Sequence, residues 1–208
     1  MRIIGGMAAG RLLKVPEGLG VRPTPDLVRQ AIFNSLGNRV ENARVLDLFS
    51  GSGAIGLECL SRGAAFVLSI EKSNRHASII RHNLDVCRLP ADRHELRVQD
   101  ALQAIRQQAE GTRRFDLILA DPPFGEKNVG KRSNSLSQKL LDDPQLPLLL
   151  QPEGFLVMGH TKRDTVTVTA WWEEMKVMKH GDSMMRFLRV AAPGQQKAPS
   201  EVSSDGGV

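Results

Sequence analysis

The chain has 208 residues, of which 41% are hydrophobic and 25% charged, as in a single globular domain with a small appendage. It has no apolar stretch near the roughly 18 residues that a membrane span needs and no apolar secretory signal at its start, so we expect a cytoplasmic protein without a membrane partner. The net charge of +5 favours a polyanionic partner, whereas the isolated Cys59 and Cys87 indicate neither a disulfide nor a metal site.

The first 40 residues form a basic extension in front of the main domain. Two short extended pieces, 2–4 and 11–15, are joined by a glycine-rich stretch, which predicts a small hairpin or a flexible loop. Thr24 can cap a helix and Pro25 suits its first position, so the apolar spacing that follows predicts a helix up to Gly37. Basic residues outnumber acidic ones throughout the extension, which favours contact with a polyanion.

Residues 41–190 alternate between short apolar runs and helical patterns. The expected strands are 45–49, 66–70, 96–98, 115–120 and 155–158, and the expected helices are 54–62, 74–86, 101–109 and a stretch around 136–150. Such alternation predicts a doubly wound α/β fold, with a mostly parallel, seven-stranded, Rossmann-like sheet covered on both faces. The β-rich segments 165–169 with 175–178, and 184–190, indicate that the sheet ends in an antiparallel pair. Residues 191–208 have the composition of a disordered tail.

A glycine loop lies where the first strand turns into the first helix, the position at which open α/β sheets bind nucleotides. Gly51, Gly53 and Gly56 match the GxGxxG pattern, and Glu71 follows about twenty residues later, where a ribose-binding acid is expected. These features fit a dinucleotide as well as S-adenosylmethionine. Asp47 favours S-adenosylmethionine, because a carboxylate would repel a pyrophosphate but suits the positively charged amino-acid end of that cofactor.

Asp100 follows the third strand directly, at the same edge of the sheet. There its carboxylate can accept a hydrogen bond from the adenine amino group of the cofactor. The alternative is that Asp100 caps the helix that begins at Ala101, and the two roles are compatible.

The tetrapeptide Asp121-Pro122-Pro123-Phe124 follows the fourth strand and therefore shares an edge with the glycine loop. An amino group on an aromatic base is a poor nucleophile, so hydrogen-bond acceptors must hold it as it attacks. The Asp121 carboxylate and the Pro122 carbonyl supply these acceptors, and Phe124 can stack on the base, which contributes about 1–3 kcal/mol. Guanine presents N1–H beside its N2 amino group, so a carboxylate favours guanine over adenine.

The motifs Arg2-Ile3-Ile4-Gly5-Gly6, Arg22-Pro23-Thr24 and Gly181-Asp182-Ser183, with the glycine loop and the tetrapeptide, resemble the RsmD-type family of bacterial 16S ribosomal RNA guanine-N2 methyltransferases. The resemblance runs from Arg2 to Val190. It implies a class I methyltransferase fold, S-adenosylmethionine as cofactor, and ribosomal RNA in the small subunit or an assembly intermediate as partner. It implies a cofactor site at Asp47, Gly51, Gly53, Glu71 and Asp100, and a base-gripping site at Asp121, Pro122 and Phe124. The residues expected to hold RNA phosphates are Arg2, Arg11, Arg22 and Arg29.

Three other functions are compatible with parts of this pattern. The first is an amino methyltransferase that acts on adenine in RNA or DNA. The second is a catalytically silent RNA-binding assembly factor, which the intact Asp47, Glu71 and Asp121 disfavour. The third, an NAD-dependent oxidoreductase, is disfavoured by Asp47 and by the lack of any tyrosine for a Tyr/Lys catalytic pair. We expect a monomeric enzyme with no metal.

Overall fold

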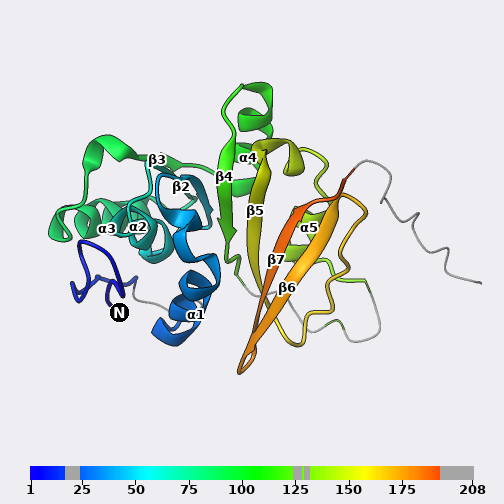
Figure 1. Ribbon diagram of the computed structural model, residues 1–208, viewed down its shortest axis with the longest axis horizontal. Helices are drawn as coiled ribbons and strands as arrows, with labels where there is room; N and C mark the ends of the chain where they lie inside the picture. The colour runs from blue at the N-terminus through cyan, green and yellow to red at the C-terminus, as the bar shows by residue number, and fades with distance from the viewer. Residues whose placement is uncertain (17–23, 124–127, 129–131, 193–208) are drawn as a thin grey trace, which may run out of the picture.

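The computed structural model describes residues 1–16, 24–123, 128 and 132–192, and its described part contains one seven-stranded sheet (Figure 1). The strands are β1 (Arg44–Leu48), β2 (Phe66–Glu71), β3 (His94–Val98), β4 (Phe115–Ala120), β5 (Leu150–Thr161), β6 (Trp172–His180) and β7 (Ser183–Val190). Their spatial order is β3-β2-β1-β4-β5-β7-β6. Neighbours from β3 to β5 are parallel, and β7 is antiparallel to both β5 and β6. The predicted mostly parallel sheet with an antiparallel end is therefore confirmed.

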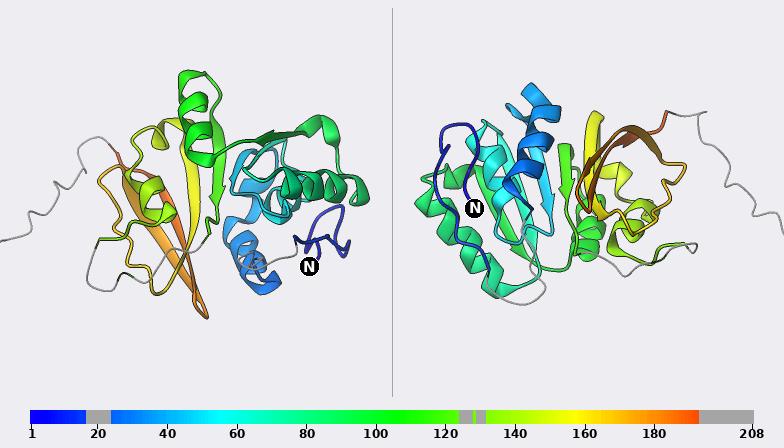
Figure 2. Two further views of the ribbon diagram at one scale, coloured as in Figure 1. Left: turned by 180° about the vertical axis from the view of Figure 1, so that it is seen from behind. Right: turned by 90° about the horizontal axis from the view of Figure 1, so that it is seen from below.

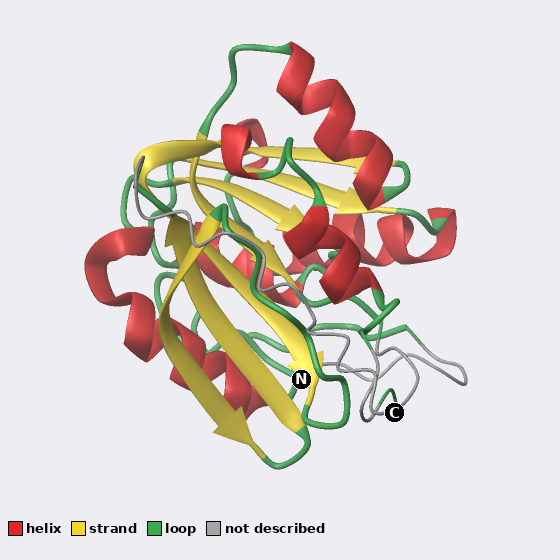
Figure 3. Cartoon of the chain, turned by 90° about the vertical axis from the view of Figure 1, so that its right-hand side faces the viewer, coloured by secondary structure: helices red, strands yellow, loops and turns green. Residues whose placement is uncertain are grey.

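Helices cover both faces of this sheet (Figure 3). They are α1 (Asp26–Leu36), α2 (Ala54–Ser61), α3 (Asn74–Val86), α4 (Ala101–Glu110) and α5 (Leu136–Asp142), with the short 3-10 helices η1 (Gly37–Val40), η2 (Ala91–Arg93) and η3 (Pro147–Leu149). Apolar side chains of α1 and α2 fill the core on one face, which we call the α1–α2 face. Those of α4, α5 and η3 fill the core on the other face. In the described part of the chain, no helix is long and apolar enough to cross a membrane.

Successive side chains of a strand point to opposite faces of the sheet, and this alternation decides which of them lie on the α1–α2 face. Val45 on β1 and Leu117 on β4 pack on the α1–α2 face, whereas their neighbours Leu46 and Ile118 pack on the opposite face. The same alternation puts Asp47 and Asp121, each an even number of residues further along its strand, on the α1–α2 face. Groups at the beginning of α1 can therefore reach the carboxyl end of β4.

The N-terminal extension packs on the domain and shares its hydrophobic core. Ile3 and Leu13 are buried in the same cluster as Leu57 of α2. An antiparallel bridge joins Arg2 to Leu12, so the predicted small hairpin is present in a minimal form. Figure 2 shows this segment beside α2 and α3, on one side of the sheet. The basic extension is thus a structural part of the domain.

The Gly5-Gly6 pair docks the extension onto the end of α2. The buried Glu58 carboxylate accepts hydrogen bonds from the Ile4 N–H at 2.7 Å and the Gly5 N–H at 2.8 Å. Gly6 has a φ of +76°, and a Cβ atom there would overlap the carbonyl oxygen of Ser61. Only glycine both adopts this positive φ easily and leaves room for the carbonyl oxygen, so the packing of the extension against α2 explains the motif.

Two local predictions are wrong. Residues 165–169 are irregular; the outer strand of the antiparallel pair is β6, which begins at Trp172. Thr24 does not cap α1, whose N-cap residue is Pro25 without a side-chain hydrogen bond. The Thr24 hydroxyl instead donates a hydrogen bond to Asp121, far away in the sequence. Propensity favours threonine as a cap, but the tertiary contact determines where this hydroxyl points.

Candidate functional site

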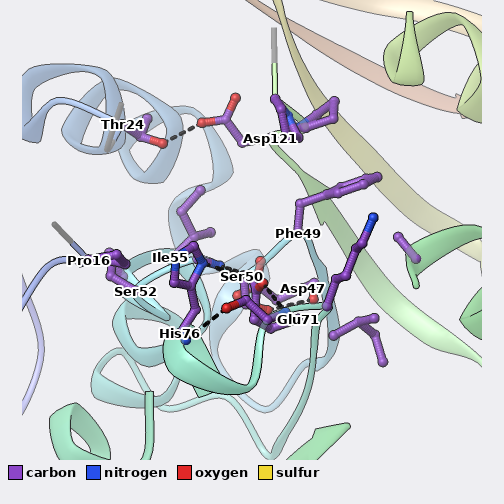
Figure 4. Close-up of a pocket in the computed structure, with 18 of the residues that line it drawn as sticks. Pro16, Thr24, Asp47, Phe49, Ser50, Ser52, Ile55, Glu71, His76 and Asp121 are labelled. Atoms are coloured by element: carbon purple, nitrogen blue, oxygen red, sulfur yellow. Dashed lines mark hydrogen bonds and ion pairs between the residues drawn. The ribbon is translucent and has the colours of Figure 1, made fainter. Parts of the chain in front are cut away.

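A cavity of about 710 Å³ opens at the carboxyl edge of the parallel strands, beside the point between β1 and β4 where the strand order reverses. Its walls come from the segments that follow β1, β2, β3 and β4, with Met1, Pro16 and Thr24 from the N-terminal extension. Figure 4 shows Asp121 with Thr24 at one end of the cavity and Asp47 with Glu71 at the other. A cavity of this size accommodates a ligand of the size of a nucleoside cofactor.

The glycine loop after β1 is a tight turn with several left-handed residues. Phe49, Gly51 and Gly53 have φ values of +61°, +57° and +78°. For Phe49 this conformation is strained, and such strain is often found where a backbone must approach a ligand. Phe49 lines the cavity, and in Figure 4 it lies between the two ends of the site. The position of Phe49 in the cavity wall was not predicted from the sequence, because no local signal indicates a left-handed backbone conformation at a phenylalanine.

Asp47 is buried below the glycine loop with only 2% of its surface exposed. Its Oδ2 accepts a hydrogen bond from the Gly56 N–H at 3.2 Å, and a Cβ atom at Gly56 would lie 2.8 Å from that oxygen. The pKa of Asp47 is raised to about 7, mainly by burial; the charges of Glu71 and Asp121 add to the increase, and the hydrogen bonds from Ser50 and Gly56 oppose it. A buried carboxyl whose nearest charged neighbours are also acids favours a cationic ligand.

Glu71 joins the glycine loop to the next loop of the cavity wall. Its two carboxylate oxygens accept hydrogen bonds from the Gly51 N–H and the Ser73 N–H, both at 2.8 Å. His76 Nδ1 lies 3.5 Å from the same carboxylate. A carboxylate has about four lone-pair sites, so Glu71 can fix both loops and still accept hydrogen bonds from a ligand.

Asp100 has the capping role that was the alternative to cofactor binding. Its Oδ1 accepts hydrogen bonds from the Leu102 N–H at 2.9 Å and the Gln103 N–H at 3.3 Å. Asp100 also lines the cavity. Since both capping bonds use Oδ1, the geometry leaves Oδ2 for a ligand, and the two predicted roles are compatible.

At the other end of the cavity, Asp121 follows β4 and its neighbours Pro122 and Pro123 also line the wall. Burial raises the pKa of the Asp121 carboxyl, and the hydrogen bond from the Thr24 hydroxyl opposes that increase. The main chain of β4 and β5 places Asp121 beside Gly159, because Ala120 pairs with Met158 in the preceding register. The Asp-Pro-Pro segment thus faces the same cavity as Asp47.

Not every predicted site residue reaches this cavity. Gly53 is absent from its described lining, and a Cβ atom there would lie 3.1 Å from the side chain of Ile80, so Gly53 serves the turn and its packing. Phe124 and Arg22 lie outside the described residues. Among the residues that the structure describes, no group of three or more His, Cys, Asp or Glu could hold a metal ion.

Arg29 was predicted to bind RNA, and the structure contradicts this. Its side chain is completely buried; the guanidinium donates hydrogen bonds to the Arg2 carbonyl at 2.5 Å and to Asp26 at 2.8 Å. A third contact reaches the Ala54 carbonyl at 3.5 Å. A phosphate cannot approach a group that water does not reach. Arg29 therefore joins the extension, α1 and the first turn of α2.

Arg2 is exposed and Arg11 is half-buried. The Arg2 side chain is 66% exposed and lies 3.8 Å from Asp26, while Arg11 donates a hydrogen bond to the Val86 carbonyl at the end of α3. Both arginines are in the extension that forms one rim of the cavity through Met1 and Pro16. The structure thus separates Arg2 and Arg11, which solvent reaches, from the completely buried Arg29.

Three residues that the sequence did not identify hold the site together. The fully buried Asn83 donates hydrogen bonds to the carbonyls of Lys14 and Ser52 and thereby links the extension to the glycine loop. Thr24 and Gly159 flank Asp121. Gly159 carried a local signal, because a glycine inside a buried strand often marks a close approach of another group. Thr24 belongs to the Arg22-Pro23-Thr24 motif, which did not indicate a contact with Asp121.

Comparisons with known proteins identify the family of the chain. The family model described as "Conserved hypothetical protein 95" matches residues 1–189. The chain is 40% identical to "Ribosomal RNA small subunit methyltransferase D" of Escherichia coli strain K12, over 95% of this chain and 94% of that protein. It is 36% identical to the protein of the same name from Haemophilus influenzae, over 65% of this chain and 69% of that one.

Solved structures show the same fold. The Escherichia coli protein yhhF superposes with a TM-score of 0.74 at 29% identity, covering 93% of this chain and 99% of that one. A hypothetical protein from Thermus thermphillus has the same TM-score at 25% identity and covers 91% of this chain and 99% of its own. The chain belongs to the family described as "Conserved hypothetical protein 95", and is an RsmD-type methyltransferase, as its motifs predicted.

Proposed function

We propose that the protein transfers a methyl group from S-adenosylmethionine to the N2 amino group of a guanine in 16S ribosomal RNA. The observation that carries this proposal is the convergence of Asp47, Glu71 and Asp121 on one cavity, with Asp121 in an Asp-Pro-Pro segment. The names of the relatives support ribosomal RNA of the small subunit as the substrate. Such a substrate is in keeping with a cytoplasmic enzyme.

The described residues fit S-adenosylmethionine better than a dinucleotide. Asp47 would hold the positively charged amino-acid end, Glu71 the ribose hydroxyls and Asp100 the adenine amino group. Burial raises the pKa of Asp47, and repulsion from the charges of Glu71 and Asp121, which line the same cavity, adds to that increase. A cation relieves that repulsion, whereas a pyrophosphate would increase it. When bound, S-adenosylmethionine supplies an electrophilic methyl group on a sulfonium centre.

At the far end of the cavity, the protein's task is to hold the base. The Asp121 carboxylate can accept hydrogen bonds from the guanine N1–H and one N2–H, and the Pro122 carbonyl can accept the other N2–H. These acceptors would direct the nitrogen lone pair toward the cofactor side of the cavity, where an N–C bond would form as the bond between the methyl carbon and sulfur breaks. The nitrogen must then lose a proton, and the Asp121 carboxylate can receive it. Burial, which raises the pKa of Asp121, makes that carboxylate a better base.

Arg2, which is exposed, and Arg11, which is half-buried, are proposed to contact phosphates of the RNA. Arg22 is proposed to do the same, on the evidence of the sequence alone. Phe124 is proposed to stack on the flipped guanine. Removing a base from its stack costs a few kcal/mol, which stacking and phosphate contacts help to offset. We propose that the partner is the small ribosomal subunit or an assembly intermediate, bound by a monomer.

The test is to incubate the protein with labelled S-adenosylmethionine and small subunits from a strain that lacks the gene, and to identify the methylated nucleoside by mass spectrometry. We expect N2-methylguanosine with the wild-type protein and none with Asp121→Asn. N6-methyladenosine instead would assign the enzyme to adenine. A complete lack of labelled RNA, despite cofactor binding, would indicate a silent assembly factor.

A further inference from the structure

The catalytic carboxylate is held from one side by a residue of the N-terminal extension. The Thr24 hydroxyl donates a hydrogen bond to Asp121 Oδ2, across 97 positions of the sequence (Figure 4). Thr24 lines the cavity immediately before α1, whose apolar side chains Val28, Ile32 and Phe33 are anchored in the core. The packing of α1 on the sheet therefore fixes the position from which the Thr24 hydroxyl donates its hydrogen bond.

On its other side, the same carboxylate occupies space that only a glycine provides. Gly159 lies on β5 next to Asp121, and a Cβ atom built on Gly159 would overlap Asp121 Oδ1. No positive φ is involved at Gly159, so its backbone conformation is open to alanine. The neighbouring carboxylate thus requires glycine here; the same Cβ atom would lie 3.3 Å from the Met185 sulfur, which is a much smaller conflict.

We propose that Thr24 and Gly159 are positioning residues that fix the Asp121 carboxylate for the base, with Thr24 holding Oδ2 and Gly159 leaving room for Oδ1. This inference rests on the proposed function, in which Asp121 grips the target amino group. A carboxylate offers about four lone-pair sites, so the bond from Thr24 leaves acceptor capacity for the N1–H and N2–H groups of guanine. The hydroxyl thereby fixes the rotation of the carboxylate without blocking it.

The same contact has an electrostatic consequence. A hydroxyl that donates to a carboxylate stabilises its charged form, and the Thr24 bond opposes the increase in the Asp121 pKa that burial causes. Asp47 on β1 lines the same cavity, as do Glu71, Lys72, His76 and Asp100, and the charge of Asp121 raises the pKa of Asp47, so these two carboxylates repel each other. On the neighbouring β5, Gly159 brings no charge. Thr24 therefore helps to keep Asp121 ionised, and so able to accept both N–H groups.

The first test measures Asp121 in the free protein and does not depend on activity. An isotope-edited NMR titration of the aspartate carboxyl carbons, assigned with Asp121→Asn, gives the pKa of Asp121. Thr24→Val should raise this pKa, because valine has the same shape but no donor, and Thr24→Ser should restore it. Thr112→Val is the matched control and should leave the pKa of Asp121 unchanged. Thr112 precedes β4 and Asp121 follows it, so the length of the strand, about 20 Å, separates the two residues. An Asp121 titration that is the same in Thr24→Val and wild type would overturn the role of Thr24.

The second test uses RNA methylation. Thr24→Val should lower kcat/KM by about tenfold to a hundredfold, the effect of one lost hydrogen bond to a charged group. The acidic limb of its pH profile should move to higher pH, and Thr24→Ser should recover both properties. If the wild-type protein methylates no RNA, the proposed function fails, whereas the titration of Asp121 still tests the role of Thr24.

Gly159→Ala tests the other side of the carboxylate. The overlapping atom is the end of a side chain, so Asp121 should rotate away, and activity should fall by at least tenfold while the unfolding temperature and cofactor affinity stay near the wild-type values. Gly111→Ala is the matched control, because a Cβ atom there would make only an ordinary contact of 3.5 Å. Wild-type turnover by Gly159→Ala would overturn the role of Gly159.

Discussion

The two ends of the cavity are built in different ways. At the cofactor end, backbone groups of nearby loops hold the acids: Gly56 donates to Asp47, and Gly51 and Ser73 donate to Glu71. At the base end, Asp121 is held by a hydroxyl from the N-terminal extension and by the space at a glycine on the next strand. The acids of the cofactor end are held by groups on β1, β2 and their loops. Asp121 at the base end is held by groups that lie far from it in the sequence.

Because the two ends are built differently, cofactor binding and methyl transfer should depend on different parts of the fold. The cofactor end can bind its ligand as long as β1, β2 and β3 and the loops that follow them are in place. The base end also depends on how α1 and the extension pack on the sheet, which Arg29, Glu58 and Asn83 secure through buried hydrogen bonds. We therefore expect cofactor binding to tolerate changes that methyl transfer does not.

Asp121→Ala should produce the largest separation between the two ends. Without the carboxylate, the base loses its main acceptor, and turnover should fall by about 100- to 10,000-fold. Cofactor affinity, measured by calorimetry, should change less than threefold or increase slightly, because removing one acid lowers the repulsion on Asp47. Asp92→Ala, an exposed change in η2, is the control. Turnover near the wild-type level in Asp121→Ala would exclude Asp121 from the chemistry.

Asp47→Asn should affect the opposite end. The charge that holds the cofactor's ammonium group is lost, so the dissociation constant should rise by about tenfold to a hundredfold. In the wild-type protein the affinity should also decline as the pH falls below about 7, where Asp47 becomes protonated. Calorimetry over a pH series checks both effects. An equal pH dependence in Asp47→Asn would assign the titration to another group.

The same substitution should stabilise the free protein at alkaline pH. The pKa of Asp47 is raised from 3.8 to about 7 in the fold, so between these values the folded state keeps a proton that the unfolded state has lost. The free energy of unfolding therefore falls as the pH rises through this window, by up to about 4 kcal/mol. Asparagine does not titrate, so the free energy of unfolding of Asp47→Asn does not fall in this window. The variant should therefore be more stable than the wild-type protein at pH 8. Denaturant unfolding at pH 5 and 8 measures the difference, and Asp85→Asn on the exposed side of α3 is the control.

Glu71→Gln should have a smaller effect on the same end. One of the two N–H groups that the carboxylate accepts, from Gly51 or Ser73, would face an amide NH2 instead of an oxygen. We expect cofactor affinity to fall by about tenfold, since one hydrogen bond is lost while the other remains. Turnover at saturating cofactor should recover to within a few-fold of the wild-type value. A turnover that stays low under those conditions would place Glu71 in the catalytic step.

The sequence predicted the cofactor end far better than the base end. Strand edges, the GxGxxG loop, Asp47 and Glu71 follow from periodicity and spacing, because the residues involved are neighbours along β1, β2 and their loops. The capping of α4 by Asp100 was predicted for the same reason. The contact of Thr24 with Asp121 spans 97 positions, and local propensity assigned that hydroxyl to a helix cap.

Charge in the extension was misinterpreted for a related reason. Composition shows that the first 40 residues are basic, but it does not show which arginines reach solvent. Arg29 recurs at helical spacing with the apolar residues of α1, and this position on the buried face is a signal that could have identified it as structural. A count of charges along the chain cannot make that distinction, whereas helical periodicity can.

The smallest expected effect concerns Arg2 and Arg11, the two described arginines of the extension that solvent reaches and that were predicted to bind RNA. If Arg2 and Arg11 contact phosphates, the double variant Arg2→Ala, Arg11→Ala should bind RNA more weakly. Its plot of log affinity against log salt should be shallower by about 0.7 to 0.9 per lost contact. Cofactor affinity should not change. RNA binding over a salt series measures the slope, and an unchanged slope would remove both residues from the RNA surface.

Arg29→Met is the informative counterpart, because Arg29 is as basic as the other two but completely buried. It should lower the free energy of unfolding by about 3–5 kcal/mol, since Asp26 and the carbonyls of Arg2 and Ala54 lose their shared partner. Under conditions where the variant is folded, its salt slope should equal that of the wild type. A reduced slope in this variant would mean that the extension opens when RNA binds and exposes Arg29. The pair of variants therefore decides whether this extension is a fixed rim of the cavity or a segment that RNA rearranges.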